Sequence, residues 1–124
     1  DVDATIALVL PPFTQPLTGA RAVRQTATER MRRPAGGLAP GAGWRDDGVS
    51  WTPETALMAW SALSLGMEEE GTRLLAWLEA HRTAARALPE KVLADGAPAG
   101  PAPLAWTCAL ILLATASRPA DPPS

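Results

Sequence analysis

The sequence has one cysteine, one histidine and one phenylalanine, and it has neither tyrosine nor asparagine. The single cysteine, Cys108, cannot form an internal disulfide, and one thiol with one histidine (His81) is a poor basis for a metal site. Because asparagine is absent, the chain carries no N-glycosylation acceptor. We therefore expect no metal and no cofactor.

Positive charge is not in excess either. Eleven Lys and Arg residues against 13 Asp and Glu residues give a formal net charge of −2, whereas a nucleic-acid or acidic-membrane partner normally selects a basic face. The longest apolar run, residues 104–116, is shorter than the roughly 20 residues that span a bilayer. We expect neither a nucleic-acid nor a membrane partner, and a soluble protein with the cytoplasm slightly favoured.

The residues that are present suit helices. Hydrophobic residues make up 47% of the 124-residue chain, enough for the core of one small domain. Alanine is abundant, valine and isoleucine are few, and 13 prolines and 10 glycines punctuate the sequence. This composition favours helices joined by Pro/Gly-rich loops and suits a sheet poorly. The chain opens Asp-Val-Asp without an initiator methionine, so we expect a piece of a longer polypeptide.

Proline, glycine and charge patterns divide the chain into about five helices. Thr52-Pro53-Glu54 is typical of a helix start, and Gly66 of a helix end. The predicted helices cover residues 3–10, 18–33, 52–65, 68–80 and 104–117. Two long loops, 34–51 and 86–103, separate them, and a Pro-rich tail follows over 118–124.

These helices alternate in character. Those over 18–33 and 68–80 are amphipathic, the first with Ala22, Val23, Ala27 and Met31 on its apolar side. Those over 52–65 and 104–117 are apolar nearly all round and must be covered on two sides. Two concentric layers of helices satisfy this pattern, with the apolar helices inside and the long loops forming a mouth at one end. The predicted fold class is therefore all-α.

The second loop carries the best candidate for chemistry. Glu90 follows a proline among apolar residues, and a carboxylate at such a place inside a mouth could serve as a general base. Lys91 beside it favours the ionised form that a base needs. Trp106, just inside the following helix, offers a flat apolar face for a sugar ring. The alternatives are a solvated surface acid and a tryptophan that simply packs in the core.

Several strings resemble one enzyme family. Leu-Pro-Glu-Lys-Val at 88–92 and Pro-Leu-Ala-Trp-Thr at 103–107 look like the last catalytic stretch of glycoside hydrolase family 15, the glucoamylase, glucodextranase and trehalase-like enzymes. Asp-Ala-Thr at 3–5 resembles the family's Asp-Ala-Ser helix, and residues 34–60 resemble its central loop and inner helix. The similarity keeps its order over residues 1–117.

The resemblance implies an (α/α)6 barrel, a double-layered toroid of which 1–117 would be the C-terminal part. It implies inverting hydrolysis of α-linked glucosides, with Glu90 as the general base and the general acid on sequence that this chain lacks. The implied partners are a carbohydrate substrate (α-glucan, dextran or trehalose type) and the remainder of the parent barrel. The isolated chain is expected to be an inactive fragment.

The first long loop supplies further candidates for substrate binding. We expect Trp44 and Trp51 to shape the mouth together with Trp106, and Arg45 and Asp46 to hydrogen-bond sugar hydroxyls. The alternatives are core packing for the tryptophans and an exposed ion pair for Arg45 and Asp46.

A rival hypothesis is a non-catalytic helical module, either a decayed barrel remnant or a partner-binding bundle. It predicts that Glu90 is freely exposed and that the tryptophans face a core instead of a shared cleft. If the barrel is incomplete, inner helices are uncovered on one flank, and such apolar patches promote self-association.

Overall fold

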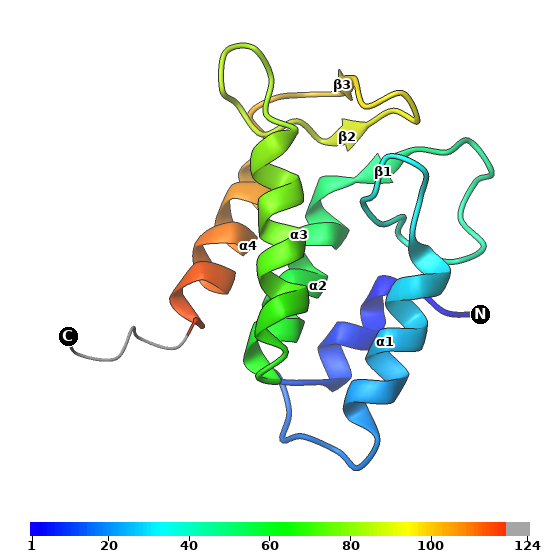
Figure 1. The fold of residues 1–124 in the computed structure, drawn as a ribbon, viewed down its shortest axis with the longest axis vertical. Coiled ribbons are helices and arrows are strands. Elements are labelled where there is room, and N and C mark those ends of the chain that lie inside the picture. Colours follow the sequence, from blue (N-terminus) through cyan, green and yellow to red (C-terminus); the bar gives the residue numbers. More distant parts are fainter. Residues whose placement is uncertain (119–124) are drawn as a thin grey trace.

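The computed structural model describes residues 1–118, so residues 119–124 of the expected tail lie outside the described part. All five predicted helices are present, together with three short strands (Figure 1). In chain order the elements are η1 (Ala4–Val9), α1 (Ala20–Met31), β1 (Ser50–Trp51), α2 (Thr52–Ser64), α3 (Glu68–Ala80), β2 (Lys91–Val92), β3 (Pro98–Ala99) and α4 (Ala105–Ala116).

Local sequence explains where the helices begin and end. The Asp3 carboxylate accepts a hydrogen bond from the backbone N–H of Thr5 (2.8 Å) and caps η1, which is a 3₁₀ helix. Pro53 lies in the first turn of α2, where its missing N–H has no helical partner to lose. At the end of α3, Nδ1 of His81 lies 2.7 Å from the carbonyl oxygen of Trp77. His81 is thus the residue at which α3 ends.

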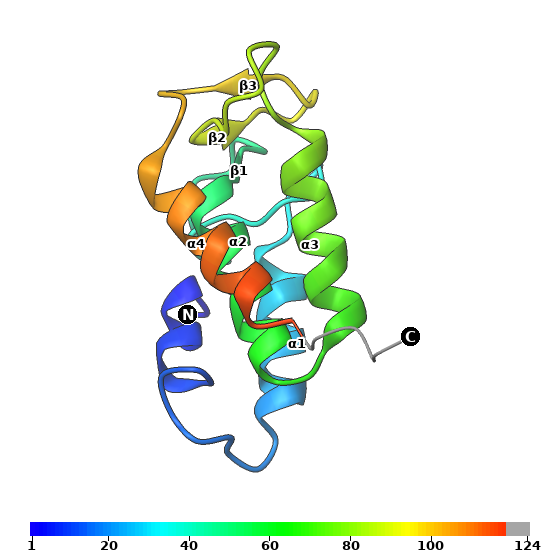
Figure 2. The same ribbon diagram turned by 90° about the vertical axis from the view of Figure 1, so that its left-hand side faces the viewer.

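Helix α2 is the centre of the molecule. It packs against α3, α4 and η1, and Figure 2 shows it between α3 and α4. Its buried residues include Ala56, Met58, Ala59 and Ala62, which are fully covered. The sequence prediction that this helix is covered on most faces is confirmed.

Helix α4 is covered on one side only, which corrects the expectation for the second apolar helix. Thr107, Leu110 and Ala114 are buried against α2. Leu112 is 71% exposed and Trp106 55% exposed. Among the described residues, no helix covers the other side of α4, and its apolar flank therefore faces solvent. An incomplete double layer of helices predicts such an uncovered flank. Within residues 1–118, no helix is both long enough and apolar enough to cross a membrane.

The strands correct the all-α prediction. They form a small antiparallel sheet in the order β1-β2-β3, with Ser50 opposite Val92, and Lys91 opposite both Trp51 and Ala99. Each strand has two residues, which is too short to leave a period in the sequence. The sheet forms because Ser50 and Val92 are fully buried, and buried backbone groups need hydrogen-bond partners. It joins the two long loops at the end where α2 and α4 begin (Figure 1).

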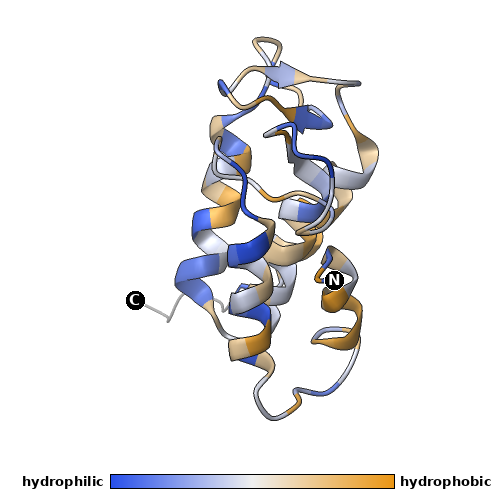
Figure 3. Cartoon of the chain, turned by 90° about the vertical axis from the view of Figure 1, so that its right-hand side faces the viewer, coloured by the Kyte–Doolittle hydropathy of each residue, from blue (hydrophilic) through white to orange (hydrophobic). Residues whose placement is uncertain are grey.

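The buried face of α1 differs from the prediction. It comprises Ala20, Arg24, Ala27, Thr28 and Met31. Ala22 is exposed and Val23 is 52% exposed, so two of the four expected core residues face outward. The buried residues still follow a helical stripe, as predicted. Arg24 lies within that stripe, although an arginine is usually expected in solvent. Figure 3 shows that the neighbouring η1, beside the N-terminus, is largely hydrophobic.

Arg33, just beyond α1, organises the first long loop. Its Nη2 donates to the carbonyl oxygens of Gly41 (3.2 Å), Ala42 (3.4 Å) and Trp44 (3.1 Å). The sequence analysis gave this side chain no structural role. The loop is therefore ordered by one guanidinium in addition to its pairing in the sheet.

Candidate active site

The backbone of Glu90 is hydrogen-bonded on one side to the start of α2 and on the other to the loop before α4. The N–H of Thr52 donates to the carbonyl oxygen of Glu90 (3.0 Å), and the N–H of Glu90 donates to that of Pro101 (3.0 Å). The Thr52 hydroxyl donates to the carbonyl oxygen of Pro89 (2.6 Å) and lies 2.8 Å from the hydroxyl of Thr107. Because these contacts are buried, Glu90 sits at a fixed position although it belongs to a loop.

The Glu90 side chain is 25% exposed and is paired with its neighbour. Its Oε1 lies 3.3 Å from Nζ of Lys91. The same ammonium lies 4.7 Å from the ring centroid of Trp51, a cation–π distance. Gly100 leaves room for the carboxylate: a Cβ added there would meet Oε1 of Glu90 at 3.1 Å. Glu90 is therefore partly enclosed, not freely exposed as the rival hypothesis requires.

The two loop tryptophans touch. The rings of Trp44 and Trp51 meet edge to face, with centroids 6.0 Å apart, and Cζ of Arg45 lies 5.8 Å from the Trp44 centroid. A continuous row of contacts thus runs from Arg45 through both indoles and Lys91 to Glu90. Asp46 is exposed and forms no side-chain hydrogen bond or ion pair with any described residue, so the structure does not join it to this row.

Trp106 and Trp44 both line a cavity of about 640 Å³. The cavity opens between η1, the loop around residues 40–44, α2 and α4. Its wall also includes Asp1, Asp3, Phe13, Glu54, Leu57 and Leu110. Glu90 and Trp51 are not part of the wall. They adjoin it, since Trp51 touches Trp44 and the charge of Glu90 acts on Glu54.

Glu54 is a functional candidate that the sequence analysis used only as a helix-start signal. It lies in the first turn of α2, and its Oε2 is buried without a hydrogen-bond partner in residues 1–118. Burial raises the pKa of this carboxyl, and the negative charge of Glu90 raises it further, while a hydrogen bond from its own backbone N–H opposes both. The sequence could have indicated Glu54, because it is an acid at the start of a helix predicted to be covered on most faces.

The remaining aromatic residues pack as expected. Trp60 and Trp77 lie against the cluster that contains Ala56, Leu78 and Leu110. Nε1 of Trp60 donates to the Ser117 hydroxyl (2.9 Å), and Nε1 of Trp77 donates to the carbonyl oxygen of Ala35 (2.7 Å). Cys108, expected to be buried, is half-buried. In residues 1–118, no three His, Cys, Asp or Glu side chains gather as a metal site would require.

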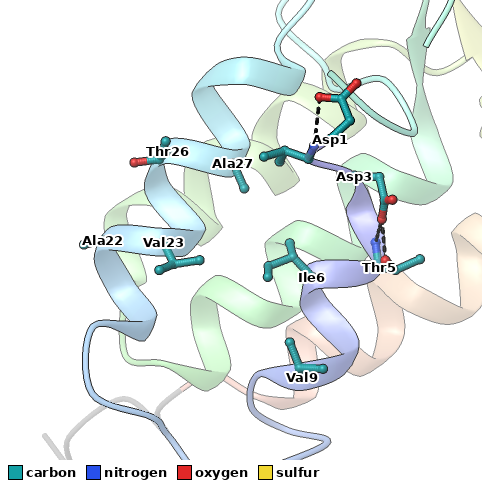
Figure 4. A pocket seen from close by; sticks show the side chains of 10 residues that line it. Asp1, Asp3, Thr5, Ile6, Val9, Ala22, Val23, Thr26 and Ala27 are labelled. Carbon is teal, nitrogen blue, oxygen red and sulfur yellow. Dashed lines mark hydrogen bonds between the residues drawn. The ribbon is translucent and has the colours of Figure 1, made fainter. Parts of the chain in front are cut away.

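A second cavity, of about 530 Å³, lies between η1 and α1 (Figure 4). Ile6, Val9 and Val23 point into it, and Asp3 beside it is engaged by the N–H of Thr5. Its walls are thus mainly apolar; of its two acids, Asp3 caps a helix and Asp1 pairs with Arg30 (3.4 Å). This cavity offers a groove for an apolar side chain but no group placed for catalysis.

No family model and no curated protein matches this sequence. Solved structures described as a glycosidase, in wild-type and singly substituted forms, superpose on 94% of this chain with a TM-score of 0.75 at 22% identity. Another of these variants gives the same TM-score at 21% identity. The chain spans 35% of the length of those structures. The chain therefore has the fold of part of a glycosidase.

Proposed function

We propose that this chain is the C-terminal part of an (α/α)6 barrel in a glycoside hydrolase resembling family 15. The observation that carries the proposal is the row of contacts from Glu90 through Lys91 and Trp51 to Trp44, which lines a cavity together with Trp106, in a fold like part of a glycosidase. In this assignment η1, α2 and α4 are inner helices, and α1 and α3 are outer ones.

Glu90 is the general base of the proposed reaction. It takes a proton from a water molecule as that water attacks the anomeric carbon, and the configuration at this carbon inverts. A carboxylic acid on another part of the parent protein protonates the leaving oxygen, at about 6.5–9.5 Å from the base. The ion pair with Lys91 (3.3 Å) and the backbone contacts of Thr52 hold the base in place before substrate arrives.

The 640 Å³ cavity holds the sugar. The indole faces of Trp44 and Trp106 cover the apolar faces of glucose rings, and the unpartnered Oε2 of Glu54 accepts a hydrogen bond from a hydroxyl. Arg45 reaches hydroxyls at the rim, with Asp46 nearby in the same loop. The substrate class is an α-linked glucoside of the α-glucan, dextran or trehalose type.

The remainder of the barrel is the second partner. Leu112 and Leu113 on the uncovered flank of α4 and the groove between η1 and α1 are apolar surfaces that neighbouring helices of a double ring would cover. Because the general acid lies on that remainder, the isolated chain binds sugar without hydrolysing it.

The decisive experiment replaces Glu90 by glutamine in the longer enzyme that contains this chain. General-base removal lowers kcat about 10²–10⁴-fold, with an unchanged circular dichroism spectrum, and proton NMR of the wild-type reaction shows the inverted anomer appearing first. Glu69→Gln, an exposed acid on α3, is the matched control and keeps full activity. Unchanged turnover in Glu90→Gln would remove Glu90 from the mechanism and support the non-catalytic module instead.

A further inference from the structure

A third cavity, of about 770 Å³, lies between α1 and the start of α3, on the face that carries the outer helices. Arg24 is part of its wall and is fully buried (0% exposed). One of its nitrogens, Nη2, donates to the carbonyl oxygen of Met58 in α2. The other two, Nε and Nη1, have no hydrogen-bond partner among residues 1–118. A buried guanidinium in the wall of this cavity thus has two donor nitrogens without an acceptor.

Arg24 also lacks a counter-charge. No carboxylate of residues 1–118 forms an ion pair with it. The acid whose charge acts on it most, Glu70, is engaged by Arg73 (Nε to Oε2, 3.0 Å) and lies 3.7 Å from Nη2 of Arg32. Burial lowers the pKa of Arg24 to about 10, so the group stays positive at neutral pH. An unpaired buried charge is unfavourable, and an external anion would relieve it.

A second set of donors faces the same cavity. Residues 67–70, at the start of α3, line it. The backbone N–H groups of Glu68, Glu69 and Glu70 have no acceptor among residues 1–118, and no side chain caps this helix. The side chains of Glu68 and Glu69 are exposed, so water screens their charge, while Glu70 is neutralised by its arginine partners. The start of α3 and Arg24 therefore both belong to the wall of this cavity, and both have N–H groups without an acceptor among residues 1–118.

We propose that this cavity binds a small oxyanion, a carboxylate or phosphate group, on Nε and Nη1 of Arg24. The planar fork of a guanidinium matches two oxygens of either group with parallel hydrogen bonds. Arg21, whose Nη2 is fixed on the carbonyl oxygen of Leu65 (2.7 Å), and Arg32 add positive charge along the wall. The site is separate from the cavity with Trp44 and Trp106, and it does not depend on the proposed hydrolysis.

Titration of the full chain with inorganic phosphate tests the site, with chloride adjusted to keep the ionic strength constant. We expect a saturable rise in Tm and a matching calorimetric binding curve. Arg24→Lys keeps the charge but loses the fork, and it should bind phosphate at least tenfold more weakly. Arg30→Lys is the matched control, because Arg30 is an exposed residue of α1 outside this cavity, and it should bind like wild type. A parallel titration with acetate shows whether carboxylate or phosphate is preferred.

Two results of these titrations would overturn the proposal. A Tm that rises equally in wild type and Arg24→Lys would show a general salt effect, and no saturable rise with either anion would show that no site exists. Glu70→Gln gives an independent check that needs no change at Arg24. If an external anion fills the cavity, removing this acid tightens phosphate binding severalfold. If Glu70 itself pairs with Arg24 in solution, the variant is less stable without phosphate and wild type is insensitive to it.

Discussion

The hydroxyls of Thr52 and Thr107 meet at 2.8 Å, and both residues are buried. This contact joins the first residue of α2 to the first turn of α4. Glu54 lies two residues after Thr52, and Trp106 lies directly before Thr107. The contact therefore fixes the spacing of two walls of the 640 Å³ cavity. Thr52 also binds the carbonyl oxygen of Pro89, which extends the same junction to Glu90.

We predict that Thr107→Val lowers the free energy of unfolding by about 0.5–1.5 kcal/mol, because the Thr107 hydroxyl contact is lost while Thr52 keeps its bond to Pro89 and the side-chain shape is kept. Urea denaturation followed by tryptophan fluorescence measures this. Thr26→Val, at an exposed position on α1, is the control and should change stability little. Equal stability of Thr107→Val and wild type would mean that the junction is held by the backbone alone.

Gly100 should be intolerant of a side chain because of Glu90. Its φ is +76°, and an added Cβ would lie 3.0 Å from Cβ of Glu90. Gly96 has a φ of +91° with nothing within 4 Å. Alanine at either position costs about 1–2 kcal/mol of backbone strain, but only Gly100→Ala also displaces Glu90. We predict that Gly100→Ala lowers both stability and the kcat of the longer enzyme, whereas Gly96→Ala lowers stability alone.

The buried Glu54 gives stability a dependence on pH. Because its pKa in the folded chain is raised above 4.5, mainly by burial, the folded state holds this proton more tightly than the unfolded state. The free energy of unfolding therefore falls as pH rises through the interval that begins near 4.5 and ends at the folded pKa. Glu54→Gln should remove this slope and raise the urea midpoint at pH 7. Glu69→Gln should keep the slope, and a slope retained in Glu54→Gln would assign it to another group.

The uncovered flank of α4 should make the isolated chain self-associate. Leu112 and Leu113 are 71% and 46% exposed on one helix. We predict that sedimentation velocity finds oligomers for wild type at tens of micromolar and mainly monomer for Leu112→Glu. Thr115→Glu adds the same charge at an exposed position of α4 that is not apolar, and it should associate like wild type. Monomeric wild type would argue against a flank that needs a partner.

The helices could be predicted because their ends carry local signals. Pro53, Gly66 and the acids before residue 71 set the limits of α2 and α3 to within one or two residues. The sheet could not, since two-residue strands depend on pairing between loops that are 40 residues apart in sequence. An uncovered flank was expected for an incomplete barrel, but the apolar pattern of α4 could not show that this helix carries it, because the pattern holds no record of which neighbours are present.

The candidate site was predictable only in part. Glu90, Trp44, Trp51 and Trp106 were proposed from a resemblance, and their contacts with one another are tertiary facts. Glu54 was used only as a helix-start signal and Arg24 was not singled out, because charged residues usually lie in solvent. Their burial results from packing of η1 and α3 against α2, which no local pattern encodes.

Arg33 links α1 to the cavity that contains Trp44 and Trp106. Its guanidinium ties the end of α1 to the carbonyl groups of Gly41 and Trp44, two residues of that cavity's wall. Any shift of α1, whether from a neighbouring helix docking in its groove or an anion settling beside Arg24, would be transmitted to that wall as a change in the width of the entrance.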